Sequence, residues 1–329
     1  MEKTKLVIAG HDLKFASLIM NYIEQTGDYE IREDKWAGHN LHDEDFSQEC
    51  LEWADIILCE WGLGNAVWYS QNKRPHQKLI VRMHRQELDT DYPNQFVLDN
   101  IDKIIAISPY IYEEFYRAFK LPREKMSLIF NALDASNLDL PKQKDAEFNL
   151  GIIGINPMMK RLDLALDIFE KLWETDNRYK LFIKGKRPEE ILWLWRNEEQ
   201  RAYYEEQYSR IETAPWKDSV QFDGFGEMSE WFQKIGYVLS TSDFESFHLA
   251  PAEGMASGAI PVVLNWDGSE TIYKKDYIFD STDRMIENIL YLNDDSRFLK
   301  QQELVKKEIA SFDIQEFGLE FKKLIEHLR

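Results

Sequence analysis

Short apolar runs alternate with amphipathic segments along most of the chain, and no other feature constrains the fold as strongly. The runs are rich in β-branched residues, as is typical of buried strands. In the first part of the chain, strands are predicted at residues 6–10, 29–32, 55–60, 78–83, 103–108 and 126–130. A helical pattern over 14–25 ends at Gly27, and Pro109 opens another helix. This alternation predicts a parallel sheet covered by helices on both faces.

A second alternating series begins after residues 134–147, which are polar, contain a proline and lack a clear period. We interpret 134–147 as an inter-domain linker. Later strands are predicted at residues 148–154, 179–183, 220–222, 237–240 and 260–263. The predicted fold class is α/β, with two doubly wound, Rossmann-like domains at 1–133 and 148–314 that face a central cleft. A final helix at 315–329 is free to pack back on the first domain.

Charge and cysteine content exclude several classes of protein. The formal net charge is −19, which disfavours binding to nucleic acid and to anionic lipid unless a basic patch overrides it. The two cysteines, Cys50 and Cys59, have no Cys-x-x-Cys context, so neither a metal site nor a redox pair is predicted. This cysteine usage and the lack of an apolar stretch of about 18 residues favour a cytoplasmic protein. Contact with the inner face of a membrane stays open, because a small local patch can meet a lipid.

The stretch 240–263 reads as a strand, a polar loop, a short helix and another strand. Glu245 and Glu253 flank the loop and the start of the helix, with seven residues between them. A helix N-terminus offers unpaired N–H groups and a positive dipole end, which suit a phosphate. One carboxylate can accept both vicinal hydroxyls of a ribose, which is the role we expect for Glu253. The alternative is that both are ordinary surface carboxylates near a helix end.

Two adjacent cations, Lys160 and Arg161, precede the first helix of the second series. Cations at a helix N-terminus oppose the dipole, so their position favours an anion bound there. Arginine can hold a phosphate through two hydrogen bonds, and lysine adds a point charge. A solvated Lys-Arg pair is an equally good interpretation of these two residues alone.

The order of residues over 245–261 is Glu-Ser-Phe-His-Leu-x3-Glu-Gly-Met-Ala-x-Gly-x2-Pro. This order resembles the E-x7-E signature of the family 4 retaining glycosyltransferases. Lys160 matches the lysine of that family's donor-phosphate loop, and Gly224 matches a glycine that follows a preceding strand. His84, at the end of the strand 78–83, resembles the family's histidine.

The resemblance implies a GT-B fold, a UDP- or GDP-sugar donor held by the second domain, and sugar transfer with retention of configuration. It implies no cofactor and no essential metal. Glu245 and His84 would be the catalytic residues, with Glu245 on the donor sugar and His84 on a sugar hydroxyl. Donor-binding residues would be Lys160, Arg161, Glu253, Phe247, His248, Leu249 and Gly224.

The chain departs from the family pattern at three positions near this site. Ile155 stands where the family has arginine, and Arg161, in place of a glycine, can restore the lost cation. His248 replaces the second glycine of the loop, where its side chain would narrow the site or contact phosphate. In the first domain, the residues expected on the acceptor side are Gly10, His11, Glu60 and Asn65.

The acceptor implied by the resemblance is a glycan or a lipid-linked sugar, most simply in the synthesis of a bacterial surface polysaccharide. Two alternatives stay open: a nucleotide-sugar epimerase of the same architecture, and a non-catalytic protein that binds a nucleotide or a glycan. The aromatic-rich segment 188–216 exceeds what the resemblance needs. It is either an extra helix packed on its own domain or a docking surface for a partner subunit or a glycan.

Overall fold

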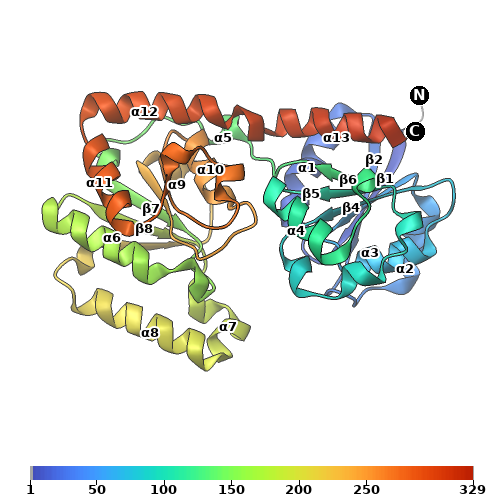
Figure 1. The fold of residues 1–329 in the computed structure, drawn as a ribbon, viewed down its shortest axis with the longest axis horizontal. Helices are drawn as coiled ribbons and strands as arrows, with labels where there is room; N and C mark the ends of the chain where they lie inside the picture. Colours follow the sequence, from blue (N-terminus) through green and yellow to red (C-terminus); the bar gives the residue numbers. More distant parts are fainter. Residues whose placement is uncertain (1–2, 329) are drawn as a thin grey trace. The chain divides into compact units, whose positions relative to one another are not determined.

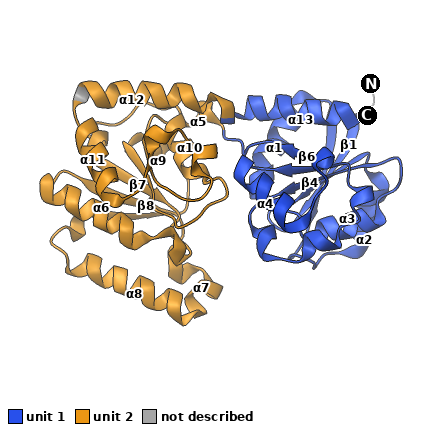
Figure 2. Ribbon diagram, viewed as in Figure 1, with its two compact units in different colours: residues 1–133, 312–329 blue, residues 134–311 orange. Residues whose placement is uncertain are grey.

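The computed structural model describes residues 3–328. The chain forms two compact units (Figure 2), unit 1 with residues 1–133 and 312–329 and unit 2 with residues 134–311. Each unit is built on a six-stranded sheet in which neighbouring strands are parallel. Helices connect the strands, as Figure 1 shows. The predicted α/β fold class is confirmed.

Unit 1 has the strand order β2-β1-β3-β4-β5-β6. Its strands are β1 (Thr4–Gly10), β2 (Tyr29–Lys35), β3 (Ile56–Glu60), β4 (Lys78–Met83), β5 (Lys103–Ala106) and β6 (Met126–Leu128). The connecting helices are α1 (Lys14–Thr26), α2 (Glu44–Trp53), α3 (Gly64–Asn72) and α4 (Pro109–Phe119). Gly27 ends α1 in the left-handed conformation, and the Ser108 hydroxyl caps α4, whose first residue is Pro109. Both helix boundaries lie where the sequence predicts them.

The helix α13 (Ile314–Leu328) completes the core of unit 1. Its apolar face packs on α1 and on the buried residues of β1, because its large side chains recur at helical spacing. The buried members of that face are Ile314, Phe317, Phe321, Leu324 and Ile325. Segments from the two ends of the chain therefore share one hydrophobic core.

Unit 2 has the strand order β12-β11-β10-β7-β8-β9. Its strands are β7 (Asn149–Ile153), β8 (Lys180–Lys184), β9 (Val220–Gly224), β10 (Tyr237–Ser240), β11 (Ile260–Leu264) and β12 (Ile278–Phe279). The longer helices are α6 (Leu162–Thr175), α8 (Glu198–Thr213), α10 (Leu249–Ala256), α11 (Thr282–Leu292) and α12 (Asp295–Glu308). The short helices are α5 (Ala135–Leu138), α7 (Leu192–Arg196) and α9 (Ser229–Gln233).

The structure places residues 134–147, interpreted from their polarity as a linker, within unit 2. Leu138 is buried, and the Lys142 ammonium donates to the Phe232 carbonyl oxygen at 2.8 Å and to the Ser257 hydroxyl at 2.9 Å. Burial lowers the pKa of Lys142 to about 7. Most other residues of the segment are exposed or half-buried, so its polarity is compatible with a place inside unit 2.

Each sheet reverses its strand order at one place. In unit 1 the reversal lies between β1 and β3, and in unit 2 it lies between β10 and β7. Loops that leave the carboxyl ends of such a strand pair run toward opposite faces of the sheet and leave a crevice suited to ligands. A ligand-binding site is therefore expected at the carboxyl ends of these two strand pairs.

We expect Gly10→Ala to destabilise unit 1, because a Cβ atom at Gly10 would lie 2.6 Å from the Glu60 carbonyl oxygen. The two strand ends would have to separate, at a cost of about 1–3 kcal/mol in the free energy of unfolding. Urea denaturation followed by tryptophan fluorescence measures this loss. The control is Gly38→Ala, where the nearest atom is the Leu41 Cβ at 3.8 Å. Equal unfolding midpoints for the two variants would contradict the expectation.

Candidate functional site

Two loops of unit 2 meet at the strand-order reversal, one after β7 (residues 154–161) and one after β10 (residues 241–248). The Thr241 hydroxyl donates to the carbonyl oxygens of Lys160 and Arg161, at 3.0 Å in each case. The Asp243 N–H donates to the Met159 carbonyl oxygen at 2.9 Å. These bonds fix the two loops against each other, although about 80 residues separate them in sequence.

Glu245 forms the centre of this arrangement. Its Oε1 atom pairs with the Lys160 ammonium, accepts from the Ser242 hydroxyl at 2.7 Å and lies 3.6 Å from His248 Nδ1. The side chains of Lys160 and Glu245 are 21% and 12% exposed, so the pair is largely shielded from water. Burial by itself would raise the pKa of Glu245, but His248 and Lys160 outweigh it and hold the pKa below its usual value. Glu245 is therefore an anion at neutral pH.

His248 stands where the pattern that the sequence resembles has glycine, and it adopts a glycine-like backbone, with φ of 54°. Its Nδ1 lies 2.8 Å from the Ser240 hydroxyl, and its carbonyl oxygen accepts from the Tyr273 hydroxyl at 2.5 Å. Burial lowers the pKa of His248 to about 4. The imidazole is therefore neutral at pH 7, and Lys160 is the cation that faces Glu245.

Arg161 also has a positive φ, 54°, at a position where the pattern that the sequence resembles has glycine. Its guanidinium donates to both carboxylate oxygens of Asp163, at 3.0 and 2.8 Å, and to Asp243 at 2.9 Å. These hydrogen bonds, first of all those to Asp163, raise the pKa of Arg161. Arg161, which the sequence analysis predicts to bind a phosphate, is therefore already paired with two carboxylates.

The N-terminus of α10 lies next to this cluster. Within residues 3–328, His248 provides no side-chain cap for the helix, and the first turn holds no acidic residue. Leu249 begins the helix, Phe247 is buried just before it, and the half-buried Glu253 follows one turn later. The positive end of the α10 dipole therefore lies next to the loop that carries Glu245.

The neighbouring strand ends are joined by their backbones. The Gly154 N–H donates to the Lys184 carbonyl oxygen at 2.8 Å, and the Gly185 N–H donates to the Gly224 carbonyl oxygen at 2.9 Å. Gly224 has φ of 63°, which explains the glycine at that position. Lys184 is only 7% exposed and adds a buried cation at this edge of the sheet.

In unit 1, His84 belongs to a buried network at the ends of β3 and β4. Its Nε2 lies 2.7 Å from Glu60 Oε1, which also accepts from Arg82 at 2.7 Å. Burial lowers the pKa of His84 despite the neighbouring Glu60. Burial also opposes the charge of Glu60, but Arg82 and His84 hold its pKa below the usual value. Glu60 is thus an anion that orients His84.

Two residues expected on the acceptor side are not surface residues. Glu60 is fully buried, and Asn65 is 3% exposed and donates to the carbonyl oxygens of Ala9 and Glu60, at 2.8 and 3.0 Å. Glu60 bonds to Arg82 and His84, and Asn65 bonds to backbone, so both side chains are used within unit 1, and their contact with an acceptor stays a prediction. His11 is half-buried, and Gly10 provides the close approach of β1 to β3.

Sequence reasoning missed several residues of the two sites. Trp61 has φ of 71°, and its ring centroid lies 4.1 Å from that of His84 and 5.8 Å from that of His11. Asp163 and Asp243, which hold Arg161, were also missed. No pattern in one sequence marks Trp61 or Asp243, because their partners come from distant segments, whereas Asp163 stands only two residues after Arg161.

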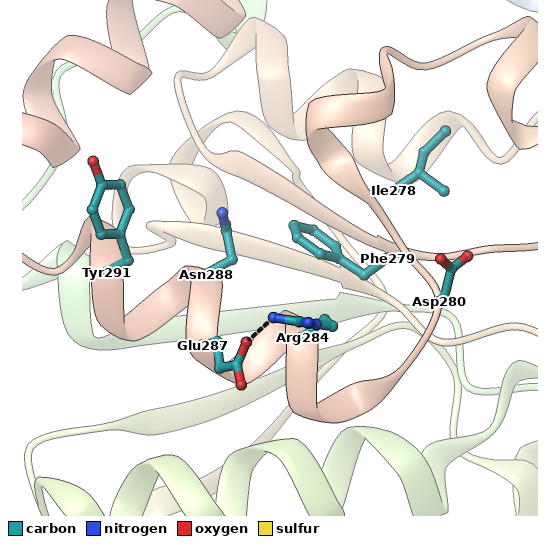
Figure 3. Close-up of a pocket in the computed structure, with 7 residues that line it drawn as sticks. All are labelled: Ile278, Phe279, Asp280, Arg284, Glu287, Asn288 and Tyr291. Carbon is teal, nitrogen blue, oxygen red and sulfur yellow. Dashed lines mark hydrogen bonds and ion pairs between the residues drawn. The ribbon is translucent and has the colours of Figure 1, made fainter.

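Two pockets of unit 2 lie away from these loops. One of about 370 Å³ lies on α11 and β12 (Figure 3), where Arg284 and Glu287 pair at 2.7 Å. It is lined by Ile278, Phe279, Asp280, Arg284, Glu287, Asn288 and Tyr291, none of which belongs to the loops above. In residues 3–328 there is no group of three or more His, Cys, Asp and Glu side chains placed to hold a metal. The helices described over the same range are all too short or too polar to cross a membrane.

Comparison with known proteins supports one family and one fold. Residues 140–308 match the family described as glycosyl transferases group 1. No curated protein matches the sequence. Among solved structures, a glycosyltransferase from Rickettsia africae ESF-5 has a TM-score of 0.74 at 14% identity, over 100% of both chains. Anabaena Alr3699/HepE in complex with UDP and glucose has a TM-score of 0.73 at 14% identity, over 98% of this chain and 100% of that chain.

A sucrose-phosphate synthase from Thermosynechococcus elongatus is similar as well, with a TM-score of 0.72 at 13% identity over 99% of both chains. At identities this low, the structural similarity shows a shared fold and says nothing about the ligand. The fold that these proteins share with the chain, with two parallel α/β sheets, is the GT-B fold.

We expect His248→Asn to weaken the dependence of stability on pH between 6.5 and 4. The folded-state pKa of His248, about 4, lies below the ordinary value of 6.5, so the unfolded chain takes up the proton first as the pH falls. The wild-type protein should therefore lose up to about 2 kcal/mol more than the variant between pH 7.5 and 5. Asparagine tolerates the left-handed backbone of this position.

Urea denaturation at the two pH values measures the difference. The control is His76→Asn, which replaces an exposed histidine and should retain the wild-type dependence. Parallel pH dependences for wild type and His248→Asn would contradict the assignment of His248 as a buried, neutral histidine.

Proposed function

Because the chain belongs to the group 1 glycosyl transferase family, we propose that it moves a sugar from a nucleotide-sugar donor, bound by unit 2, to a glycan or lipid-linked acceptor. We further propose that it is a family 4 enzyme that retains the anomeric configuration. The observation that carries the proposal is the Lys160–Glu245 pair beside the N-terminus of α10, at the strand-order reversal of unit 2. It places a cation, a carboxylate and helix N–H groups at one position.

The chemistry needs these groups together. Departure of a nucleoside diphosphate builds negative charge on the leaving oxygen, and Lys160 and the start of α10 would stabilise that charge. Glu253, one turn into α10, would accept the ribose hydroxyls. Glu245 would contact the donor sugar, where its negative charge can stabilise positive charge that develops on the sugar ring. Lys184 adds positive potential from the neighbouring strand.

The donor we favour is a UDP- or GDP-sugar, and the transfer would need no metal because Lys160 and the helix N–H groups supply the positive charge. The Anabaena protein of the same fold binds UDP and glucose, which supports a UDP-sugar. We propose a role in the synthesis of a bacterial surface polysaccharide, at the inner face of the membrane. His84, oriented by Glu60, would bind a sugar hydroxyl.

One alternative has an observation in its favour. Arg161 is already paired with Asp163 and Asp243, which fits a protein that binds a nucleotide without turning it over. Nucleotide binding with no release of free sugar and no transfer would support that reading. The family match favours transfer over the epimerase alternative.

The test is a thermal-shift and hydrolysis screen with UDP-, GDP-, ADP- and CDP-sugars, in the presence and absence of a chelator. We expect stabilisation and slow sugar release with a UDP- or GDP-sugar, and no effect of the chelator. If none of the nucleotides stabilises the protein, the donor site is misassigned.

We expect substitution of Glu253 to affect nucleotide affinity and substitution of Glu245 to affect turnover. Glu253→Ala should raise the dissociation constant of the nucleotide about tenfold, the effect of losing a hydrogen bond to a charged group. Glu245→Gln should lower kcat about 100-fold and change nucleotide affinity little. Calorimetric titration with the nucleotide and steady-state kinetics measure the two effects.

The matched control is Glu270→Ala, which removes an exposed glutamate of unit 2 outside these loops and should behave as wild type. Unchanged kcat in Glu245→Gln would remove this residue from the catalytic list. Unchanged affinity in Glu253→Ala would remove the ribose contact.

A further inference from the structure

The helix α8 (Glu198–Thr213) belongs to the aromatic segment 188–216 and runs beside α6 in unit 2 (Figure 1). Arg210 of α8 donates to Asp167 and Glu170 of α6, at 2.7 and 2.6 Å. Most of the large apolar side chains of the segment pack in unit 2, with Leu194, Tyr204, Ile211 and Trp216 buried. The structure thus favours the extra packed helix over a docking surface.

One face of α8 meets the loop that carries Lys160 and Arg161. Gln200 accepts from the Met158 N–H at 2.9 Å, and the buried Tyr204 donates to the Ile155 carbonyl oxygen at 2.6 Å. Tyr203 lies between them on the same helical face, because residues three and four apart point the same way. Bonds from this face therefore reach the start and the middle of the loop.

The Tyr203 hydroxyl makes two bonds to a single residue. It accepts from the Asp163 N–H at 3.0 Å and donates to Asp163 Oδ1 at 2.7 Å. The same Oδ1 accepts from the Arg161 Nε at 3.0 Å, and Arg161 in turn reaches Asp243 of the facing loop. A chain of hydrogen bonds thus runs from α8 through Asp163 and Arg161 to the loop that carries Glu245.

We propose that Tyr203 is a positioning residue for the donor site, because its hydroxyl fixes Asp163 and through it the guanidinium of Arg161 and the backbone that carries Lys160. The proposal rests on the proposed function, since it takes this loop as the phosphate-binding loop. Under it, α8 sets the affinity for the nucleotide without touching the nucleotide. A group held in one orientation before binding loses less entropy when the ligand arrives, so affinity depends on it.

The attachment of α8 itself does not depend on the Tyr203 hydroxyl. Trp216 donates to Glu170 at 2.9 Å, and Arg210 bonds the same carboxylate. Tyr208 donates to Glu189 at 2.9 Å, away from the loop. Removing the hydroxyl of Tyr203 therefore changes the loop and leaves the helix in place, which separates a positioning role from a structural one.

The test compares Tyr203→Phe with Tyr208→Phe in the full-length protein. Each variant loses one hydroxyl from the same helix and keeps its ring. For Tyr203→Phe we expect the dissociation constant of UDP or GDP, measured by calorimetry, to rise about three- to tenfold. The KM for the donor should rise with it, while kcat changes less. Tyr208→Phe should bind as wild type, and both variants should have similar melting temperatures without ligand.

A double-mutant cycle completes the test. In an Asp163→Asn background, Tyr203→Phe should weaken binding little further, because the two residues act through one path. Full additivity of the two effects, or wild-type affinity in Tyr203→Phe, would overturn the positioning role while leaving the proposed function in place. No nucleotide binding by the wild-type protein would overturn the proposed function and this role with it.

Discussion

The reversal of strand order between β10 and β7 is the constraint on which the candidate site depends. The chain builds β7, β8 and β9 outward and then returns to place β10 on the other side of β7. The loops after β7 and β10 therefore meet at one edge of the sheet, and the Lys160–Glu245 pair joins them there. Bonds between the strand ends, such as that from Gly154 to Lys184, hold the edge in register. The family match over residues 140–308 falls on this same unit.

The sequence predicted the strands well, because a buried parallel strand is a run of apolar residues and needs no partner to be recognised. It also singled out Glu245 and Lys160, which the structure brings into contact. It could not predict that Glu60 points inward to His84, since that bond joins residues from two strands. Residues 134–147 were read as a linker because their polarity does not show that Lys142 finds its acceptors inside unit 2.

The two departures from the family pattern share a backbone property. His248 and Arg161 stand where the family pattern that the sequence resembles has glycine, and both hold a positive φ of 54°. For residues with a Cβ atom this conformation costs roughly 1–2 kcal/mol each. The surrounding hydrogen bonds offset that cost, through Ser240 for His248 and through Asp163 for Arg161. The loops thus keep the path that glycine would give them and gain two polar side chains, and strain of this kind tends to persist where it serves a site.

The placement of α13 has a consequence for the order in which the protein forms during synthesis. Phe317 and Phe321 fill the core of unit 1, yet residues 134–311, which form unit 2, are translated before them. All of unit 2 is therefore synthesised before α13, the helix that packs on α1 of unit 1, has been made. Domains generally fold as units as they emerge, so the second unit in the sequence can complete its core first. Until α13 is made, the apolar surface of α1 lacks the helix that covers it, and chaperones that bind such surfaces can meet it there.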